Sequence, residues 1–144
     1  MKKILSTVCM FLLLLSTLTL SGCKKAKKEE TIMNISCNPS VEFILDKDNK
    51  VVSVTALNED GNVILVGETF VGLTADEAAK LFVKISTETG FIVEGSTSNN
   101  EVKVSISGDN KKANQIYDDV KSKVSKYLSD NNINVNLKNI EAPT

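Results

Sequence analysis

The chain has 144 residues, with 17 lysines and arginines against 18 aspartates and glutamates, and its formal net charge is −1. It contains no histidine, arginine or tryptophan. Histidine-based catalysis and histidine zinc sites are therefore excluded. Acidic residues outnumber lysines after residue 30 and no arginine fork is available, so we do not expect nucleic acid as a partner. We also expect no cofactor, no metal site and no enzyme that turns over a substrate.

Residues 1–22 are predicted to be a lipoprotein signal peptide. A positive start, Met1-Lys2-Lys3, precedes an apolar stretch over residues 4–20 that is too short and too interrupted to span a bilayer. The stretch ends in Leu20-Ser21-Gly22-Cys23, which resembles the lipobox of bacterial lipoproteins. We therefore expect Cys23 to become the lipidated N-terminus. The alternative is a secretory signal or membrane anchor that carries a cysteine by chance.

Residues 23–30 are predicted to be a lipidated cysteine and a short tether. Two or three acyl chains on Cys23, palmitate among them, would hold the protein on the extracytoplasmic face of the cell membrane. The lysines of the KKAKKEE sequence that follows Cys23 either lie against anionic headgroups or form part of a solvated spacer. Cys37 remains as the one other cysteine of the mature chain, so no disulfide within the chain is expected.

The predicted folded domain, residues 31–144, opens with three β-strands. Residues 31–37 alternate between apolar and polar side chains, which predicts a strand with Met33, Ile35 and Cys37 on its inner face. Residues 41–45 and 51–57 have the same period of two and flank a polar turn, which predicts a hairpin. Its second strand is expected to place three side chains on one face: Val52, Val54 and Ala56.

A helix is predicted to begin at Thr74. Residues 58–61 before it are predicted to be a loop, and the apolar run 63–66 is too short to assign. Thr74 and Glu77 have the spacing of a capping box, in which each side chain bonds the main-chain N–H of the other residue. Apolar residues at helical spacing follow, and Gly90 suits the left-handed residue that ends a helix.

The second half of the domain is predicted to contain strand, helix and strand. Residues 91–93 and 102–106 suggest strands on either side of a loop, and a long amphipathic helix begins at Asp109 or Asn110. Ile133, Val135 and Leu137 alternate as a last strand. The order β-β-β-α-β-α-β predicts an α+β two-layer sandwich, in which two amphipathic helices cover one face of a mostly antiparallel sheet.

The stretch from Asn38-Pro39-Ser40 through the hairpin to Asn58-Glu59-Asp60-Gly61 resembles the extracytoplasmic domain of RsgI-like anti-sigma factors. That domain, also called a SEAL domain, is similar in architecture to the SEA domain of mucins. The resemblance extends over roughly residues 31–140 and implies a SEA-like, ferredoxin-like fold. It also implies self-cleavage between Asn38 and Pro39. In that family a sigma-binding domain and a transmembrane helix precede the module, whereas here the signal and Cys23 precede it. The resemblance therefore implies no anti-sigma activity.

The chemistry of an Asn-Pro bond favours the same reaction. Proline has no N–H, so Pro39 cannot attack the Asn38 side chain in the deamidation that affects other Asn-X bonds. The Asn38 side-chain nitrogen can instead attack its own main-chain carbonyl and expel the Pro39 amine. Alternatively, the Ser40 hydroxyl serves as nucleophile or as proton donor to the departing nitrogen. In the absence of cleavage, Asn38-Pro39 is a bulge or strand break.

The signal, the predicted fold and the Asn-Pro bond together support two functions. The first is a membrane-tethered module that cleaves itself at Asn38-Pro39, with Asn38, Pro39 and Ser40 as the catalytic segment, and that acts in envelope signalling or mechanical release. The second is an uncleaved lipid-anchored module that binds an envelope protein or ligand. Loss of cleavage in Asn38→Ala would distinguish the first function from the second.

Overall fold

The computed structural model describes residues 30–93 and 100–140. The predicted signal peptide, Cys23 and most of the tether lie outside the described residues, as does most of the predicted loop after residue 94. The elements, in chain order, are β1 (Thr31–Ser36), β2 (Ser40–Leu45), β3 (Val51–Ala56), α2 (Glu59–Leu65), α3 (Ala75–Glu88), β4 (Glu101–Ser107), α4 (Asn110–Asp130) and β5 (Asn136–Asn139).

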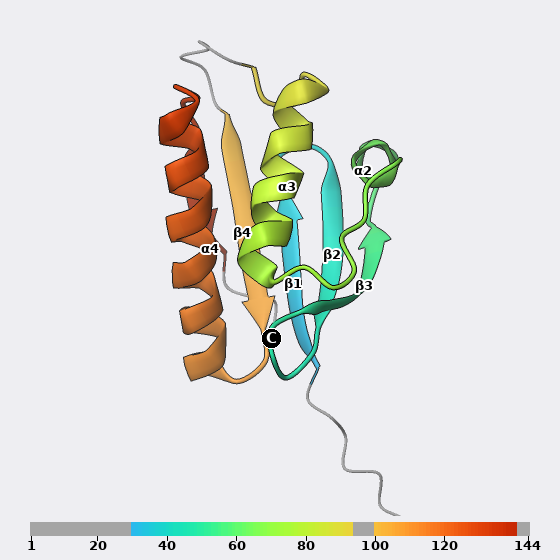
Figure 1. Ribbon diagram of the computed structural model, residues 1–144, viewed down its shortest axis with the longest axis vertical. Helices are drawn as coiled ribbons and strands as arrows, with labels where there is room; N and C mark the ends of the chain where they lie inside the picture. Colours follow the sequence, from blue (N-terminus) through green and yellow to red (C-terminus); the bar gives the residue numbers. More distant parts are fainter. Residues whose placement is uncertain (1–29, 94–99, 141–144) are drawn as a thin grey trace, which may run out of the picture.

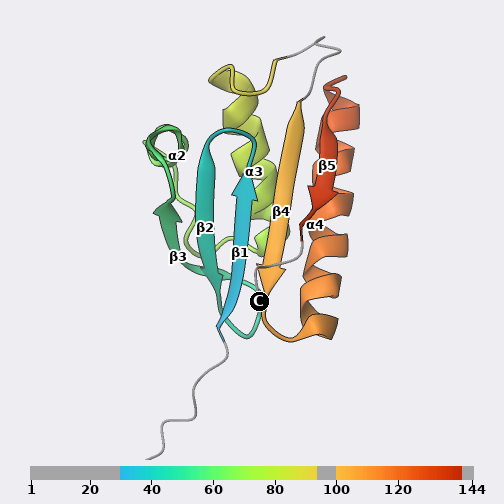
Figure 2. The ribbon, with the colours of Figure 1, turned by 180° about the vertical axis from the view of Figure 1, so that it is seen from behind.

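The described residues form two layers, as predicted. Helices α3 and α4 lie side by side on one face of a five-stranded sheet, and short α2 lies beside β3 (Figure 1). Seen from behind, the opposite face of the sheet carries no helix of the described residues (Figure 2). Apolar side chains from the strands and from both long helices meet between the layers and are shielded from water. The α+β two-layer sandwich is therefore confirmed.

Strand β1 occupies the centre of the sheet, whose order is β3-β2-β1-β4-β5. It pairs antiparallel with β2 on one side and with β4 on the other. Its alternating sequence suits a sheet covered on one face, because Met33 and Ile35 are completely buried on the helix side while Ile32, Asn34 and Ser36 on the other face are only partly buried. Removing β1 would therefore break hydrogen bonds on both of its edges.

The sheet is mixed, whereas the sequence predicts a mostly antiparallel one. Three of the pairings are antiparallel, but β5 runs parallel to β4. The reason is the length of α4, which carries the chain back along the whole sheet, so that β5 starts at the same end as β4 (Figure 2). As predicted, α4 starts beside Asp109, whose side chain accepts a hydrogen bond from the Lys112 N–H. In the described ranges no helix is long and apolar enough to cross a membrane.

One prediction for the hairpin is wrong at a single residue. Val54 and Ala56 face their β2 partners on the core side, but Val52 is about half exposed. The pairing shifts at this point, because Leu45 is opposite Val51 while Ile44 is opposite Ser53. Val52 is thus the extra residue of a β-bulge, and a bulged residue leaves the alternation of its strand.

The predicted loop at residues 58–61 is instead the start of α2. Asn58 is the N-cap, and its side-chain oxygen accepts the Gly61 N–H at 2.8 Å. The short helix that follows buries the side chain of Ile64. Gly61 lies directly against the first residue of β2, since a Cβ at this position would overlap the Ser40 carbonyl oxygen. A glycine is therefore required where α2 touches the sheet.

The expected strand over residues 91–93 is absent. Its residues form bends, and Ile92 folds back so that its N–H donates to the Ser86 carbonyl at the end of α3. Ile92 is buried there, and burial against the helix takes the place of strand pairing. Gly90 has a φ of 79° and follows the end of α3, as its left-handed role predicts.

The predicted capping box is also wrong, although α3 does begin after Thr74. The Thr74 hydroxyl donates to the Asp76 carboxylate and makes no capping bond, while Glu77 pairs with Lys80 and with Lys123 of α4. A carboxylate bonds a charged ammonium more strongly than a neutral N–H, so the lysines take Glu77 away from the cap. These contacts lower the pKa of Glu77, with the hydrogen bond from Lys123 as the largest cause.

We expect Gly61→Ala to lower the free energy of unfolding by about 1–3 kcal/mol, because the new methyl group forces α2 away from β2. Chemical denaturation of the variant and of the parent chain would measure the change. Asn62→Ala is the matched control, since Asn62 is exposed on the same helix and its loss should change stability by less than about 0.5 kcal/mol. Equal stability of Gly61→Ala and this control would contradict the steric role of Gly61.

Candidate functional site

Asn38 stands at the apex of the turn between β1 and β2. The Cys37 N–H donates to the Pro39 carbonyl at 3.1 Å, so Asn38 is the single residue between two hydrogen-bonded neighbours. Its φ is 107°, in the region that favours glycine and beyond the usual left-handed range near +60°. Such backbone conformations cost on the order of 1–3 kcal/mol. The turn therefore stores strain at the residue that precedes the Asn38-Pro39 bond.

The side chain of Asn58 connects this turn to α2. Its amide nitrogen donates to the Asn38 carbonyl oxygen at 2.6 Å. Its amide oxygen accepts two main-chain N–H groups, from Ser40 at 2.9 Å and from Gly61 at 2.8 Å. One side chain thus caps the helix, holds the start of β2 and contacts the carbonyl of the Asn38-Pro39 bond.

Asp60, in the first turn of α2, holds the other reactive group of Asn38. Its carboxylate accepts a hydrogen bond from the Asn38 side-chain nitrogen at 2.9 Å. Asn38 itself is exposed, and Asp60 is half-buried. In Figure 1, α2 lies near the end of the sheet at which β1 passes into β2. The carbonyl and the amide nitrogen of Asn38 are both bonded by residues of the α2 N-terminus.

The other two predicted site residues, Pro39 and Ser40, follow Asn38 into the start of β2. Pro39 is buried and fixes the turn against the domain. Ser40 bonds through its main chain, since its N–H donates to Asn58 and its carbonyl accepts the Leu57 N–H at 2.8 Å. Neither bond involves the Ser40 hydroxyl. Participation of that hydroxyl in cleavage stays a prediction.

Cys37 precedes the turn and is partly buried against the core. Burial raises the pKa of its thiol from 9.0 to about 11, while a hydrogen bond with Ser86 has a smaller, lowering effect. Reactive cysteines have lowered pKa values and accessible sulfur atoms. Cys37 lacks the lowered pKa, and its packing against the core agrees with the inner-face position that the sequence predicts.

Sequence reasoning missed Asn58 and Asp60 as site residues. Both lie in the stretch Asn58-Glu59-Asp60-Gly61, for which the sequence pattern predicts a loop. An asparagine after a strand, followed by two acidic residues, is a signal for a helix N-cap, and it could have identified α2. The position of α2 beside residue 38 can be found only once the pairing of the strands is known.

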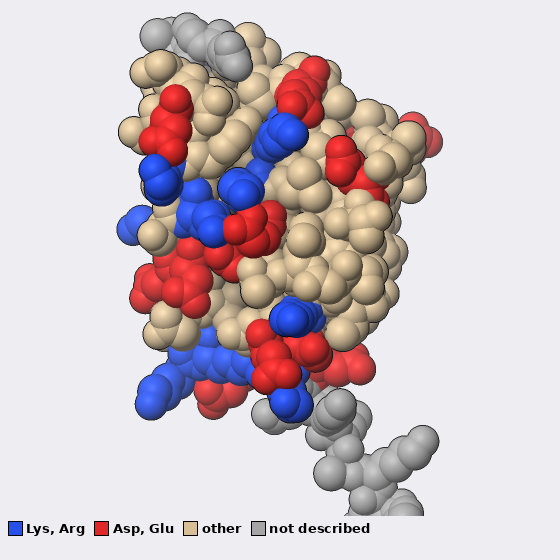
Figure 3. All heavy atoms as spheres, viewed as in Figure 1, with Lys and Arg blue, Asp and Glu red and all other residues tan. Residues whose placement is uncertain are grey.

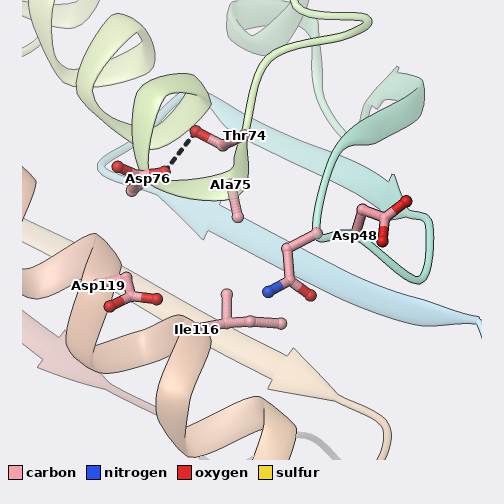
Figure 4. Close-up of a pocket in the computed structure, with 7 residues that line it drawn as sticks. Asp48, Thr74, Ala75, Asp76, Ile116 and Asp119 are labelled. Atoms are coloured by element: carbon pink, nitrogen blue, oxygen red, sulfur yellow. Dashed lines mark hydrogen bonds between the residues drawn. The ribbon is translucent and has the colours of Figure 1, made fainter.

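Away from the turn, a hollow lies between the β2–β3 turn, the start of α3 and α4. It has a volume of about 130 Å³, and Asp48, Asp76 and Asp119 are among the residues around it (Figure 4). Within residues 30–93 and 100–140, no group of three or more acidic or cysteine side chains is placed to hold a metal ion. The helix side of the molecule carries lysines and acids interspersed (Figure 3). Positive and negative side chains are thus mixed over this face, and neither sign of charge dominates it.

Comparison with known proteins supports the family resemblance that the sequence of the turn and the hairpin indicates. Residues 30–144 match the family model described as the anti-sigma factor RsgI-like central domain. Two curated relatives come from Acetivibrio thermocellus. Anti-sigma-I factor RsgI7 is 28% identical over 102 residues, which are 70% of this chain and 18% of that protein. Anti-sigma-I factor RsgI3 is 30% identical over 88 residues, which are 61% of this chain and 14% of that protein.

The chain thus spans less than a fifth of the length of either relative. The family model covers this domain from the residue before β1 to the end of the chain. The segment that carries the strained Asn38-Pro39 turn and the Asn58–Asp60 contacts lies inside it. The chain belongs to the family of the anti-sigma factor RsgI-like central domain.

Proposed function

We propose that this protein is a lipid-anchored, extracytoplasmic member of its family that cleaves its own chain once, between Asn38 and Pro39, and acts in envelope signalling. The observation that carries the proposal is the turn itself. Asn38 is held at φ 107°, its carbonyl and its side-chain nitrogen are each hydrogen-bonded, and the next residue has no N–H. The anti-sigma relatives give the signalling context.

The proposed reaction is cyclisation of Asn38. The side-chain nitrogen loses a proton and bonds to the Asn38 carbonyl carbon, the Asn38-Pro39 bond breaks, and the Pro39 nitrogen takes up a proton. The products are a C-terminal succinimide at Asn38 and a new N-terminus at Pro39. No water is consumed until the succinimide hydrolyses. Strain in the turn raises the energy of the starting chain and so lowers the barrier.

The cut chain would remain one particle under resting conditions. Residues up to Asn38 would stay attached through β1, which is paired on both edges and buries Met33 and Ile35. Because Cys23 lies on the membrane side of the cut, separation would leave β1 on the membrane and release the domain from Pro39 onward. Force or a bound ligand that separates the two parts is thereby converted into an envelope signal.

A further prediction concerns the cut itself. The wild-type chain without its signal should give two masses that divide between Asn38 and Pro39 after denaturation, and one particle before it. The two masses should sum to that of the intact chain while the succinimide persists, and to one water more after its hydrolysis. Intact mass spectrometry with and without denaturant measures both.

Asn38→Gly is the sharpest uncut variant, because glycine accepts φ 107° without strain and has no side-chain nitrogen. It should remain a single chain with wild-type stability or better, whereas Asn38→Ala removes the nucleophile at a conformational cost. Ser40→Ala distinguishes cyclisation by Asn38 alone, which leaves the rate unchanged, from participation of the Ser40 hydroxyl, which slows cleavage. A wild-type chain that stays intact for days contradicts self-cleavage and supports an uncleaved binding module.

The next prediction concerns the anchor. Expressed with its signal in a bacterium that processes lipoproteins, the protein should incorporate labelled palmitate and partition into detergent. Cys23→Ser should abolish both, since the hydroxyl is not a substrate for the lipid transfer that a lipobox cysteine receives. Cys37→Ser is the matched control and should keep the label. Palmitate on Cys23→Ser, or its absence from the wild type, contradicts lipid anchoring at Cys23.

A further inference from the structure

We infer that Asn58 and Asp60 are catalytic residues of the proposed self-cleavage: Asn58 stabilises the oxyanion that forms on the Asn38 carbonyl, and Asp60 accepts the proton from the attacking Asn38 nitrogen. This inference rests on the proposed function and deepens it. Both residues come from the N-terminus of α2, twenty or more positions after the bond that they act on.

Asn58 is placed where negative charge develops. When the Asn38 carbonyl carbon becomes tetrahedral, its oxygen gains charge, and a donor already aimed at that oxygen stabilises it. The Asn58 nitrogen lies 2.6 Å from this oxygen in the uncut chain. The position of the donor is fixed independently, because the oxygen of the same amide is bound by the N–H groups of Ser40 and Gly61. The donor therefore needs no reorganisation as the charge appears.

Asp60 is placed at the other end of the same reaction. An amide nitrogen is a poor nucleophile until it loses a proton, and a carboxylate within hydrogen-bonding distance can take that proton as the new bond forms. The Asp60 carboxylate already accepts from the Asn38 nitrogen at 2.9 Å. One step then follows from the geometry: the proton passes from the Asn38 nitrogen to Asp60 as the nitrogen bonds to the carbonyl carbon.

The remaining step returns the proton. The oxyanion held by Asn58 collapses, the bond from Asn38 to Pro39 breaks, and the Pro39 nitrogen takes the proton that Asp60 accepted, directly or through solvent. Asp60 ends as a carboxylate and Asn58 is unchanged. The electron pair of the broken bond leaves on Pro39, so no external reactant is required.

Asn58 also caps α2, so its catalytic part has to be separated from its structural one. Asn58→Asp does this. Aspartate is an equally good N-cap and keeps an oxygen for the N–H groups of Ser40 and Gly61, but it replaces the donor that faces Asn38 with an oxygen. Asp60→Asn is the corresponding variant on the other side, because it keeps an oxygen that accepts from Asn38 and loses the basic carboxylate.

The experiment follows cleavage of the full chain, made by cell-free translation without membranes and quenched in denaturant at successive times. We expect Asn58→Asp to slow cleavage by about 100-fold or more, the effect of losing one oxyanion donor. We expect Asp60→Asn to slow it by about 100-fold or more as well, the effect of losing a general base. Glu59→Gln is the matched control, since it makes the same change in the same helical turn and should be cut at the wild-type rate.

One further measurement distinguishes a catalytic role from a structural one. Hydrogen exchange at the Gly61 N–H should remain as slow in both variants as in Asn38→Gly, which shows that the cap and α2 are intact. Wild-type rates in Asn58→Asp or in Asp60→Asn would overturn the role given to that residue while self-cleavage stands. Slow cleavage together with rapid Gly61 exchange would reduce the residue to a structural role. An uncut wild-type chain would overturn the inference and the proposed function together.

Discussion

One side chain, that of Asn58, decides how the hairpin turn and α2 sit against each other. Its amide oxygen accepts from the first residue of β2 and from Gly61 of the helix, and its amide nitrogen donates to the apex of the turn. Without these bonds, the main-chain groups that it holds would depend on water, and the seven residues of α2 are too few to form a stable helix by themselves. The absence of a side chain at Gly61 lets the helix approach closely enough for one amide to reach all three partners. The geometry of the Asn38-Pro39 bond depends on this contact.

The elements that the sequence predicts correctly are those with a clear period. β1 and β2 alternate strictly, and α4 carries a buried stripe from Ile116 to Leu128 over several turns, so burial of one face defines each of them. α2 fails this test because a helix of seven residues with one buried side chain, that of Ile64, shows no period. The capping box fails for a different reason: Glu77 has the correct local spacing, but Lys123, which is distant in sequence, offers it a stronger partner. The parallel direction of β5 follows from where α4 ends, which is a property of the assembled layers.

The candidate site is likewise predictable from the sequence only in part. The chemistry of Asn38-Pro39 can be read from two adjacent residues, because a missing N–H and a side-chain amide are local facts. The strain cannot be predicted from adjacent residues. It arises only when Cys37 and Pro39 are hydrogen-bonded across a single residue between two paired strands. Asn58 and Asp60 belong to the motif that resembles the family, but their contact with Asn38 depends on the hairpin and on the close approach of α2. Local sequence thus identifies the bond at risk, and tertiary structure supplies the groups around it.

The central position of β1 has a consequence for reversibility. Once β1 is drawn out of a cut molecule, β2 with β3 and β4 with β5 no longer share a strand, and each is left as a two-stranded ribbon on one side of an open gap. Met33 and Ile35 leave the core with β1, so the apolar side chains that they covered would meet water and the gap would close or collapse. In the proposed function, the released domain has no covalent link to the membrane, so each molecule would respond once. The cell would measure the stimulus by the number of molecules lost, and new synthesis would restore its sensitivity.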